Sequence, residues 1–303
     1  MFDLTLQVGI GHSVSLFELA FAGLIVGIIA GMFGVGGGFV LTPLLMHVFG
    51  IPTPVAVGSA ICQTCGTSIA SFVKYRKLKR GDPRMDVVMM GGSLVGIDAG
   101  TRLLAYLANT RPVSVLGKAI PLSQLVIDVS FIVLLSVMAF WMIIEVWNLR
   151  GKPLRGDVTI PGVLVTKVRI PPYIDLPGVA LTGVSVPMMV YLGFILGLAS
   201  GVMGIGGGVI LTPILMYGFG LSARNAAGSG ILLLFVTVAL GTFLHAQQGF
   251  VFLPLAMAIL VGSSIGSQIG ALITQRLANR VLRLLFAVLL LLTVALIISY
   301  MLW

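Results

Sequence analysis

The stretch from Val179 to Gly220 contains no charged residue, and the runs Phe131–Ile144 and Leu284–Leu302 are equally free of charge. About 20 apolar residues make one crossing of the ~30 Å hydrocarbon layer of a bilayer. Only 9% of the 303 residues are charged, whereas a soluble domain devotes about a quarter of its residues to charge. The chain therefore supplies many membrane crossings, and we expect an all-α integral membrane protein.

The formal net charge of +9 does not indicate nucleic-acid binding. Basic residues in a membrane protein mark the loops that stay cytoplasmic, and the sequence contains no RNA- or DNA-binding motif. The segment Met1–Glu18 lacks the basic start and the small-residue cleavage site of a removable signal peptide. We therefore expect the first apolar segment to remain in the lipid bilayer as a membrane span.

Internal repetition is the most informative pattern in the chain. Residues Ala30–Ile61 read AGMFGVGGGFVLTPLLMHVFGIPTPVAVGSAI, and Ser200–Ile231 read SGVMGIGGGVILTPILMYGFGLSARNAAGSGI, with about half of the positions identical at an offset of 170. The same offset relates Gly92, Ser93, Gly96 and Gly100 to Gly262, Ser263, Gly266 and Gly270. The unit is duplicated, which predicts a first membrane repeat at 1–149, a linker at 150–178 and a second membrane repeat at 179–303.

Each repeat should contain about five membrane segments. The segment Leu16–Gly50 would measure about 52 Å as one helix, so we expect two passes, the second short or re-entrant, that fold back at the glycines. The expected segments are Leu16–Phe33, Phe39–Gly50, Val55–Lys74, Asp86–Leu107 and Leu122–Trp147, then Val184–Met203, Val209–Gly220, Asn225–His245, Phe252–Leu277 and Leu282–Leu302. The alternating apolar residues of Arg150–Pro177 predict a small surface hairpin.

The basic residues indicate that the two repeats have opposite orientations. Six lysines and arginines lie between Lys74 and Arg84, but the corresponding loop Ala246–Val251 has none. The bias is reversed after the next segment, where the second repeat carries Arg276, Arg280 and Arg283 and the first repeat has only Arg111 and Lys118. Similar sequence with opposite charge bias is typical of inverted-topology repeats. We expect a bacterial cytoplasmic (inner) membrane protein with a cytoplasmic linker and both termini outside.

The two glycine clusters are the strongest candidates for a substrate site. A glycine costs a helix about 1 kcal/mol relative to alanine, and broken backbone at membrane depth is tolerated where protein or a water-filled cavity satisfies it. Carriers use such breaks to direct half-helix N-termini at anions, although glycines also allow close helix packing. The candidate substrate-binding glycines are Gly36, Gly37, Gly38, Gly206, Gly207 and Gly208.

Polar residues close to the glycine clusters extend this candidate site. Each cluster is followed by a Thr-Pro pair and then by a Gly-Ser pair, and their hydroxyl groups can bind an oxyanion. The alternatives are local satisfaction of the backbone at proline and small-residue packing. The additional candidates are Thr42, Ser59, Thr212, Asn225 and Ser229.

The duplicated pattern G-x-G-G-G, x-x-Leu-Thr-Pro and a Gly-Ser pair about 15 residues later resembles the sulfite exporter TauE/SafE family over essentially the whole chain. The resemblance implies a secondary transporter of sulfur-containing anions such as sulfite, sulfoacetate or other organosulfonates. We expect a small sulfur-containing anion to bind near the midplane between the two breaks and to be carried by alternating access. An anion channel with the same filter is the alternative.

Ionisable residues inside apolar segments are candidates for a coupling route. Asp98 and Arg102 lie four residues apart on one helix and form either a local neutralising pair or part of a proton or substrate route. Asp128 and Gln63 are further candidates, whereas a lone histidine such as His47 or His245 is more often structural. Cys62 and Cys65 form an isolated C-x-x-C, which is a weak signal, so we expect no metal and no cofactor.

An enzyme would need a catalytic constellation that this sequence lacks. Gly262–Gly266 matches G-x-S-x-G formally, but it lies within an expected helix without a preceding strand. We expect no enzymatic activity. A purely structural scaffold would not need duplicated, helix-breaking glycines.

Overall fold

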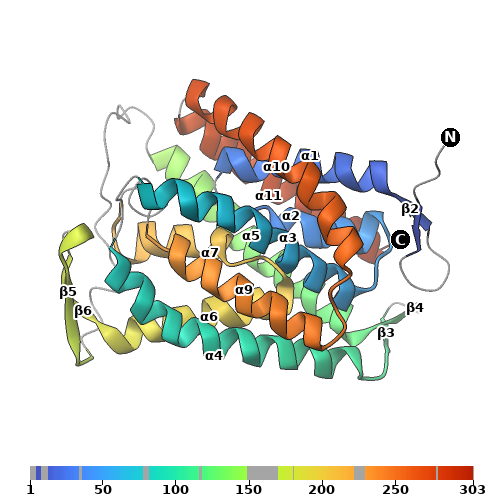
Figure 1. Cartoon of the computed structure of the whole chain (residues 1–303), viewed down its shortest axis with the longest axis horizontal. Helices are drawn as coiled ribbons and strands as arrows, with labels where there is room; N and C mark the ends of the chain where they lie inside the picture. Colours follow the sequence, from blue (N-terminus) through green and yellow to red (C-terminus); the bar gives the residue numbers. More distant parts are fainter. Residues whose placement is uncertain are drawn as a thin grey trace.

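The computed structural model describes residues 5–7, 13–33, 36–77, 82–115, 118–148, 170–179, 181–221, 229–277 and 279–302. Most of them lie in helices that run roughly along the long axis of the molecule (Figure 1). In the first half, the elements are β1 Thr5–Gln7, β2 Ser13–Ser15, α1 Leu16–Phe33, α2 Gly38–Pro43, the π-helical turn η1 Leu44–Val48, α3 Thr53–Lys77, α4 Pro83–Ala108, β3 Val113–Val115, β4 Lys118–Ile120 and α5 Leu122–Asn148.

The second half repeats this order of helices. Its elements are β5 Tyr173–Leu176, the 3₁₀ turn η2 Pro177–Val179, β6 Leu181–Ser185, α6 Val186–Met203, α7 Gly208–Pro213, the π-helical turn η3 Ile214–Gly218, α9 Ile231–Gln247, α10 Leu253–Arg276 and α11 Asn279–Leu302. The helices predicted from the apolar segments are confirmed, with most ends within about three residues, as is usual for helix boundaries. The start of the segment predicted from Asn225 lies outside the described residues, and the helix there is described from Ile231.

Six of the described helices are long and apolar enough to cross a membrane: α1, α4, α5, α6, α10 and α11. Two shorter apolar helical segments, Gly38–Val48 and Leu232–Gln247, lie between them in the sequence. The outer faces remain apolar, as large hydrophobic side chains such as Phe17 (80% exposed) and Leu272 (63% exposed) point outward. Such faces suit hydrocarbon rather than water. The chain is an all-α, multi-pass integral membrane protein.

The described strands form three antiparallel hairpins, β1–β2, β3–β4 and β5–β6. β2 and the β3–β4 hairpin lie at one end of the molecule, and β5–β6 lies at the opposite end (Figure 1). The hairpin predicted within Arg150–Pro177 falls mainly outside the described residues, but β5 begins in its last part and pairs with β6.

Two pairs of helices are in backbone contact through glycines. A Cβ atom added to Gly27 would collide with the backbone of Ser263, and one added to Gly197 would collide with the backbone of Ser93. Backbone contact this close requires glycine, as in other small-residue helix interfaces. The glycines are Gly23, Gly27, Gly31, Gly262, Gly266 and Gly270 between α1 and α10, and Gly92, Gly96, Gly100, Gly193, Gly197 and Gly201 between α4 and α6.

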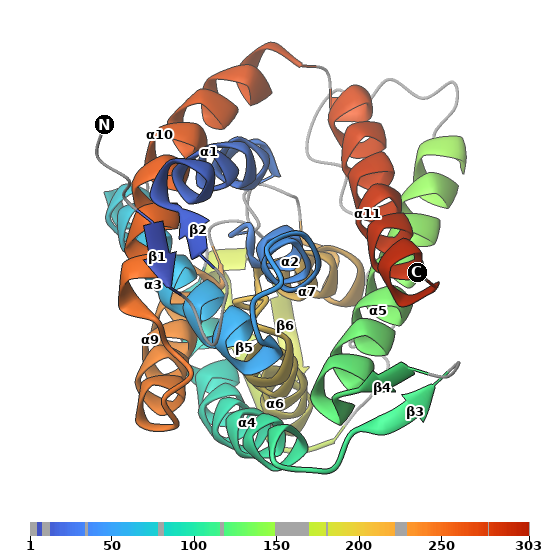
Figure 2. The ribbon, with the colours of Figure 1, turned by 90° about the vertical axis from the view of Figure 1, so that its right-hand side faces the viewer.

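These contacts join the first half of the chain to the second. The glycine contacts between α1 and α10 have counterparts between α6 and α4 at the same offset of 170 residues, such as Gly31 with Ser267 and Gly201 with Ile97. The two halves also meet where α3 packs on α9 and where α5 packs on α11. Figure 2 looks along the helices and shows α2 and α7 in the centre, with the longer helices arranged around them.

Candidate substrate site at the glycine breaks

Both glycine clusters hold the backbone in the left-handed region of φ. The φ angles are 84° at Gly36 and 73° at Gly37 in the first half, and 71° at Gly206 and 81° at Gly207 in the second. Residues with a Cβ atom rarely adopt these angles, whereas glycine does so freely. Gly37 and Gly207 are the N-caps of α2 and α7, so each cluster ends one helix and begins a short one.

The two breaks are in contact with each other. A Cβ atom added to Gly38 would lie 2.6 Å from the carbonyl oxygen of Gly204 and 2.8 Å from that of Ile205. The methyl carbon Cγ2 of Thr64 would lie 3.4 Å from a Cβ atom at Gly36 and 2.5 Å from one at Gly206. Thr64 itself is fully buried. The two glycine turns therefore meet around one side chain of α3, in the interior of the molecule.

Each short helix begins at its glycine turn. The amides of Val40 and Leu41 donate to the carbonyl of Gly37, and those of Ile210 and Leu211 donate to the carbonyl of Gly207. The amides that precede this first turn have no partner within the helix, as at any helix N-terminus. The partial positive charge of these amides suits an anion.

Thr42 and Thr212 occupy equivalent positions but differ in hydrogen bonding. The hydroxyl of Thr212 donates to the carbonyl of Gly208 over 3.2 Å. The hydroxyl of Thr42 is fully buried and has no hydrogen-bond partner among the described residues. It faces the second break, since a Cβ atom on Gly204 would lie 2.9 Å from it. A buried hydroxyl without a partner is costly, so Thr42 is a candidate to bind a ligand at this site.

Comparison with known proteins identifies the family of the chain. The family model described as sulfite exporter TauE/SafE matches residues 19–297. The chain belongs to this family. It is 25% identical over 258 residues to the probable membrane transporter protein YunE of Bacillus subtilis, a match that covers 82% of this chain and 85% of that relative. It is 26% identical over 282 residues to a probable membrane transporter protein of Methanocaldococcus jannaschii, covering 89% and 90%.

No solved structure matches this TauE/SafE chain. Its family and relatives are those of membrane transporters rather than of enzymes, and the protein is a multi-pass membrane transporter. The formal G-x-S-x-G match at Gly262–Gly266 lies inside α10, as its position in the sequence indicates.

Ser59 and Ser229 of this TauE/SafE protein are engaged with the backbone of the opposite half. The hydroxyl of Ser59 accepts a hydrogen bond from the amide of Phe252 over 3.1 Å, and that of Ser229 accepts one from the amide of Asp82 over 3.2 Å. Both serines are buried. Their hydroxyl groups fix the start of α10 and of α4, so structure accounts for both without a ligand. Asn225 lies outside the described residues.

The coupling candidates Gln63, Asp98 and Arg102 lie in different surroundings. Gln63 is buried and donates to the hydroxyl of Ser263 over 2.7 Å, which links α3 to α10 beside Thr64. Arg102 and Asp98 form an ion pair at 3.0 Å, with 76% and 39% of their side chains exposed. In this exposed i,i+4 pair, on the outer surface of α4, each side chain neutralises the charge of the other.

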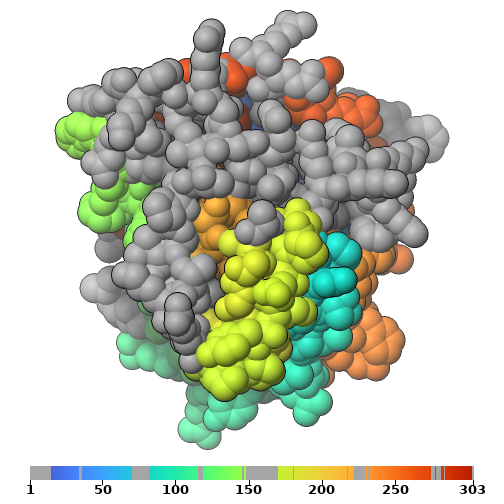
Figure 3. All heavy atoms as spheres, turned by 90° about the vertical axis from the view of Figure 1, so that its left-hand side faces the viewer, coloured from blue at the N-terminus to red at the C-terminus, as the bar shows by residue number. Residues whose placement is uncertain are grey.

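Asp82 and Asp86 form buried contacts that sequence analysis missed. Asp86 accepts a hydrogen bond from the amide of Gly230 over 2.6 Å, at the start of α9. Asp82 accepts one from the amide of Gly178 over 3.0 Å and so ties the β5–β6 hairpin to the start of α4. Figure 3 shows the atoms of this hairpin beside those of α4 at this end of the molecule.

Two further groups of polar side chains lie among the packed helices. His47 of η1 and Asp128 of α5 contact each other, although the sequence analysis treated them separately. The half-buried cysteines Cys62 and Cys65 are free thiols. Within the described ranges, no group of three or more histidine, cysteine, aspartate or glutamate side chains is arranged to hold a metal ion.

Proposed function

We propose that this transporter carries small sulfur-containing anions, such as sulfite, sulfoacetate or other organosulfonates, and binds them between the two glycine breaks. The observation that carries the proposal is the contact between the two glycine turns. The hydroxyl of Thr42, which has no partner in the described part of the chain, faces this contact. The chain's membership of the sulfite exporter TauE/SafE family supports a sulfur oxyanion as the substrate class.

The chemistry of the site suits an oxyanion. Backbone amides at Gly36–Gly38 and Gly206–Gly208, together with the hydroxyl of Thr42, supply donors without a full positive charge. Donors of this kind bind anions well where water is excluded and the dielectric constant is low. The absence of a Cβ atom lets a ligand approach the backbone closely. Ser59 and Ser229 then hold the helices that surround the site rather than the anion.

An inverted-topology repeat would provide alternating access. The α1–α10 and α4–α6 contacts recur at one offset, and α1 begins at the end of the molecule that carries β2, whereas α6 begins at the end that carries β6 (Figure 1). Opposite directions combined with equivalent contacts are what an inverted repeat requires. Movement of the breaks relative to their surroundings would expose the site to each side in turn.

We further propose that the end with β5–β6 is cytoplasmic and that both termini are outside. Arg84 and Arg276 lie near this end, at the start of α4 and the end of α10, in agreement with the positive-inside rule. A reporter fused after Trp303 tests this orientation. An extracytoplasmic signal is expected, and a cytoplasmic signal would overturn the orientation.

The substrate class is tested by ligand-induced thermal stabilisation of the purified protein. The panel contains sulfite, thiosulfate, sulfate and sulfoacetate, with acetate as the carboxylate control. A ligand at about 100 times its Kd stabilises by about 2.7 kcal/mol, which is a measurable shift in Tm. At least one sulfur anion should raise the Tm more than acetate does, and no response to any of them would refute the proposed class.

A substitution tests whether the stabilising anion binds at the glycine breaks. Gly37→Val should abolish this stabilisation, because valine tolerates neither the φ of 73° nor the contact with Val26, whose Cγ1 atom would lie 2.9 Å from the new Cβ. Gly183→Ala, at a glycine with a φ of 65° but open space around it, is the control for backbone strain outside the membrane segments. An unchanged response in Gly37→Val would exclude this site.

A further inference from the structure

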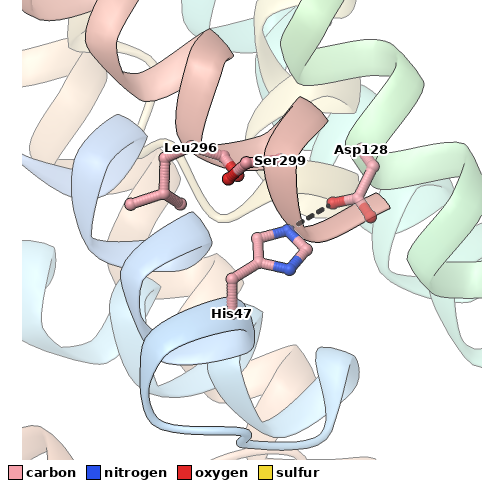
Figure 4. Close-up of polar contacts among 4 residues, drawn as sticks. All are labelled: His47, Asp128, Leu296 and Ser299. Carbon is pink, nitrogen blue, oxygen red and sulfur yellow. Dashed lines mark hydrogen bonds and ion pairs between the residues drawn. The ribbon is translucent and has the colours of Figure 1, made fainter. Parts of the chain in front are cut away.

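A buried histidine–carboxylate pair lies outside the proposed substrate site. The Nε2 atom of His47 lies 3.0 Å from Oδ1 of Asp128, a residue 81 positions later, and their side chains are only 3% and 5% exposed. Figure 4 shows the imidazole directed from η1 toward Asp128 on α5, with Leu296 and Ser299 of α11 nearby. The pair thus joins η1 to α5 beside α11.

The described groups around the pair include one aromatic ring and few titratable side chains. The ring of Tyr300 stacks on that of His47, with centroids 5.4 Å apart and an angle of 30° between the planes. Among the described side chains of the helices packed around η1, the remaining titratable groups are an exposed glutamate on α1 and two cysteines on α3: Glu18, Cys62 and Cys65. The charge of the pair itself changes when His47 gains or loses a proton.

The fold does not require this pair. The equivalent turn η3 carries Tyr217 at the position that corresponds to His47, and the sequence from Val179 to Trp303 contains no aspartate or glutamate. The second half therefore builds the same broken segment without a buried ion pair. A buried ion pair is a weak source of stability, whereas ionisable side chains within a membrane typically mark proton or ion pathways.

The position of the pair connects it with the glycine break. His47 belongs to the helical segment Gly38–Val48, which starts at the first glycine turn and also contains Thr42. Asp128 belongs to α5, which packs on α11. A change in the strength of the contact between His47 and Asp128 therefore acts on the segment that lines the proposed substrate site.

We propose that His47 and Asp128 form a proton-binding site, so that this protein carries its anion together with a proton. When a proton binds to the imidazole, the pair changes from one negative charge to a neutral ion pair; when the proton leaves, the carboxylate of Asp128 remains. An anion in the same low-dielectric interior is repelled by the deprotonated pair and tolerated by the protonated one. Anion and proton therefore favour each other's binding. This inference rests on the proposed function.

Proton uptake on anion binding is the direct test. Calorimetric titration of the purified protein with sulfoacetate, in two buffers that differ in ionisation enthalpy, gives the number of protons bound with each anion. The sulfonate and carboxylate of this probe remain ionised between about pH 6 and pH 8. The wild-type protein should take up a proton, and its affinity should increase as the pH falls, by at most about tenfold per pH unit for one coupled proton.

Conservative variants test the two residues. His47→Gln, Asp128→Asn and the double variant H47Q/D128N keep hydrogen-bonding side chains but cannot form the proton-dependent pair. His47→Gln and the double variant should still bind sulfoacetate, with no proton uptake and an affinity that changes less than about twofold across this range, since the linkage is lost. Asp128→Asn keeps the imidazole but not the carboxylate, so its proton uptake should differ from that of the wild-type protein. Tyr300→Phe keeps the ring and removes the phenol, and it should retain the wild-type proton uptake. Proton uptake that persists in H47Q/D128N, or is absent in the wild-type protein, refutes the site.

A second measurement distinguishes failure of this site from failure of the substrate proposal. If no anion of the panel binds, the proposed function fails, and the proton site is then judged on the ligand-free protein. The carbon-13 signal of the His47 imidazole, assigned by its loss in His47→Gln, should change with pH over the range in which the protein stays folded. It should also respond to Asp128→Asn. A signal that stays constant with pH overturns the proton site.

Discussion

The hydroxyl of Ser59 accepts a hydrogen bond from the amide of Phe252, 193 residues away, at the entrance to α10. Ser229 makes the equivalent contact with the amide of Asp82 at the entrance to α4. Each Gly-Ser pair therefore fixes the fourth helix of the opposite half. The two halves of the chain are tied together by polar contacts as well as by glycine packing.

Ser59→Ala should lower stability without weakening anion binding. The amide of Phe252 would lose its acceptor in a buried position, at a cost of about 1–2 kcal/mol. Thermal unfolding in detergent should show a lower Tm, whereas the Kd for the stabilising anion should stay within about twofold of wild type, since the serine does not contact the ligand. A large loss of affinity with unchanged Tm would instead make Ser59 a ligand of the anion.

Gly92→Ala and Gly91→Ala form a matched pair on α4. A Cβ atom at Gly92 would collide with the carbonyl oxygen of Val190, whereas one at Gly91 has nothing within 4 Å. Alanine gains about 1 kcal/mol of helix propensity over glycine, so Gly91→Ala should be neutral or slightly stabilising. Gly92→Ala should destabilise by about 1–3 kcal/mol through overpacking. Equal Tm values in the two variants would contradict the backbone contact between α4 and α6.

Asp86→Ala should destabilise the protein far more than Asp98→Ala does. Asp86 is buried, and its carboxylate accepts the hydrogen bond from the amide of Gly230. Loss of a buried acceptor costs about 1–3 kcal/mol. Asp98 forms only an exposed pair with Arg102, and its loss should change stability by less than about 0.5 kcal/mol. Thermal unfolding of both variants checks this contrast, and similar losses would show that the contact at Gly230 contributes little.

The helices could be predicted because each depends on its own residues. The apolar segment Leu284–Leu302 has the length that a bilayer demands, and the left-handed backbone at Gly37 and Gly207 marks the start of α2 and of α7. The duplication also located equivalent positions in the two halves. These properties are local, or repeat at a constant offset, so one sequence is enough to reveal them.

The partners of polar groups could not be predicted in the same way. Asp86 and Gly230 are 144 residues apart, and His47 and Asp128 are 81 apart, so nothing in their local sequence indicates that they meet. Ser59 has the right chemistry for an anion ligand, but packing of the opposite half against it engages its hydroxyl. The partner of each polar side chain depends on which helices pack against each other, and the local sequence does not carry that information.

Thr42→Val should raise stability and weaken anion binding at the same time. The hydroxyl of Thr42 is buried without a partner among the described residues, so replacing it with the isosteric methyl group removes a desolvation cost of about 1–3 kcal/mol. The same change removes a donor to the anion, which should reduce affinity by about tenfold for a hydrogen bond to a charged group.

Thr212→Val is the matched control, because the hydroxyl of Thr212 already donates to the carbonyl of Gly208. Its loss removes a satisfied hydrogen bond, worth about 1 kcal/mol, and should not raise the Tm. Thermal unfolding and calorimetric titration with the stabilising anion measure both quantities for each variant. A higher Tm together with a weaker affinity in Thr42→Val would identify a binding group, because a residue that served only the fold would lose stability on substitution. A lower Tm with unchanged affinity would therefore remove Thr42 from the site.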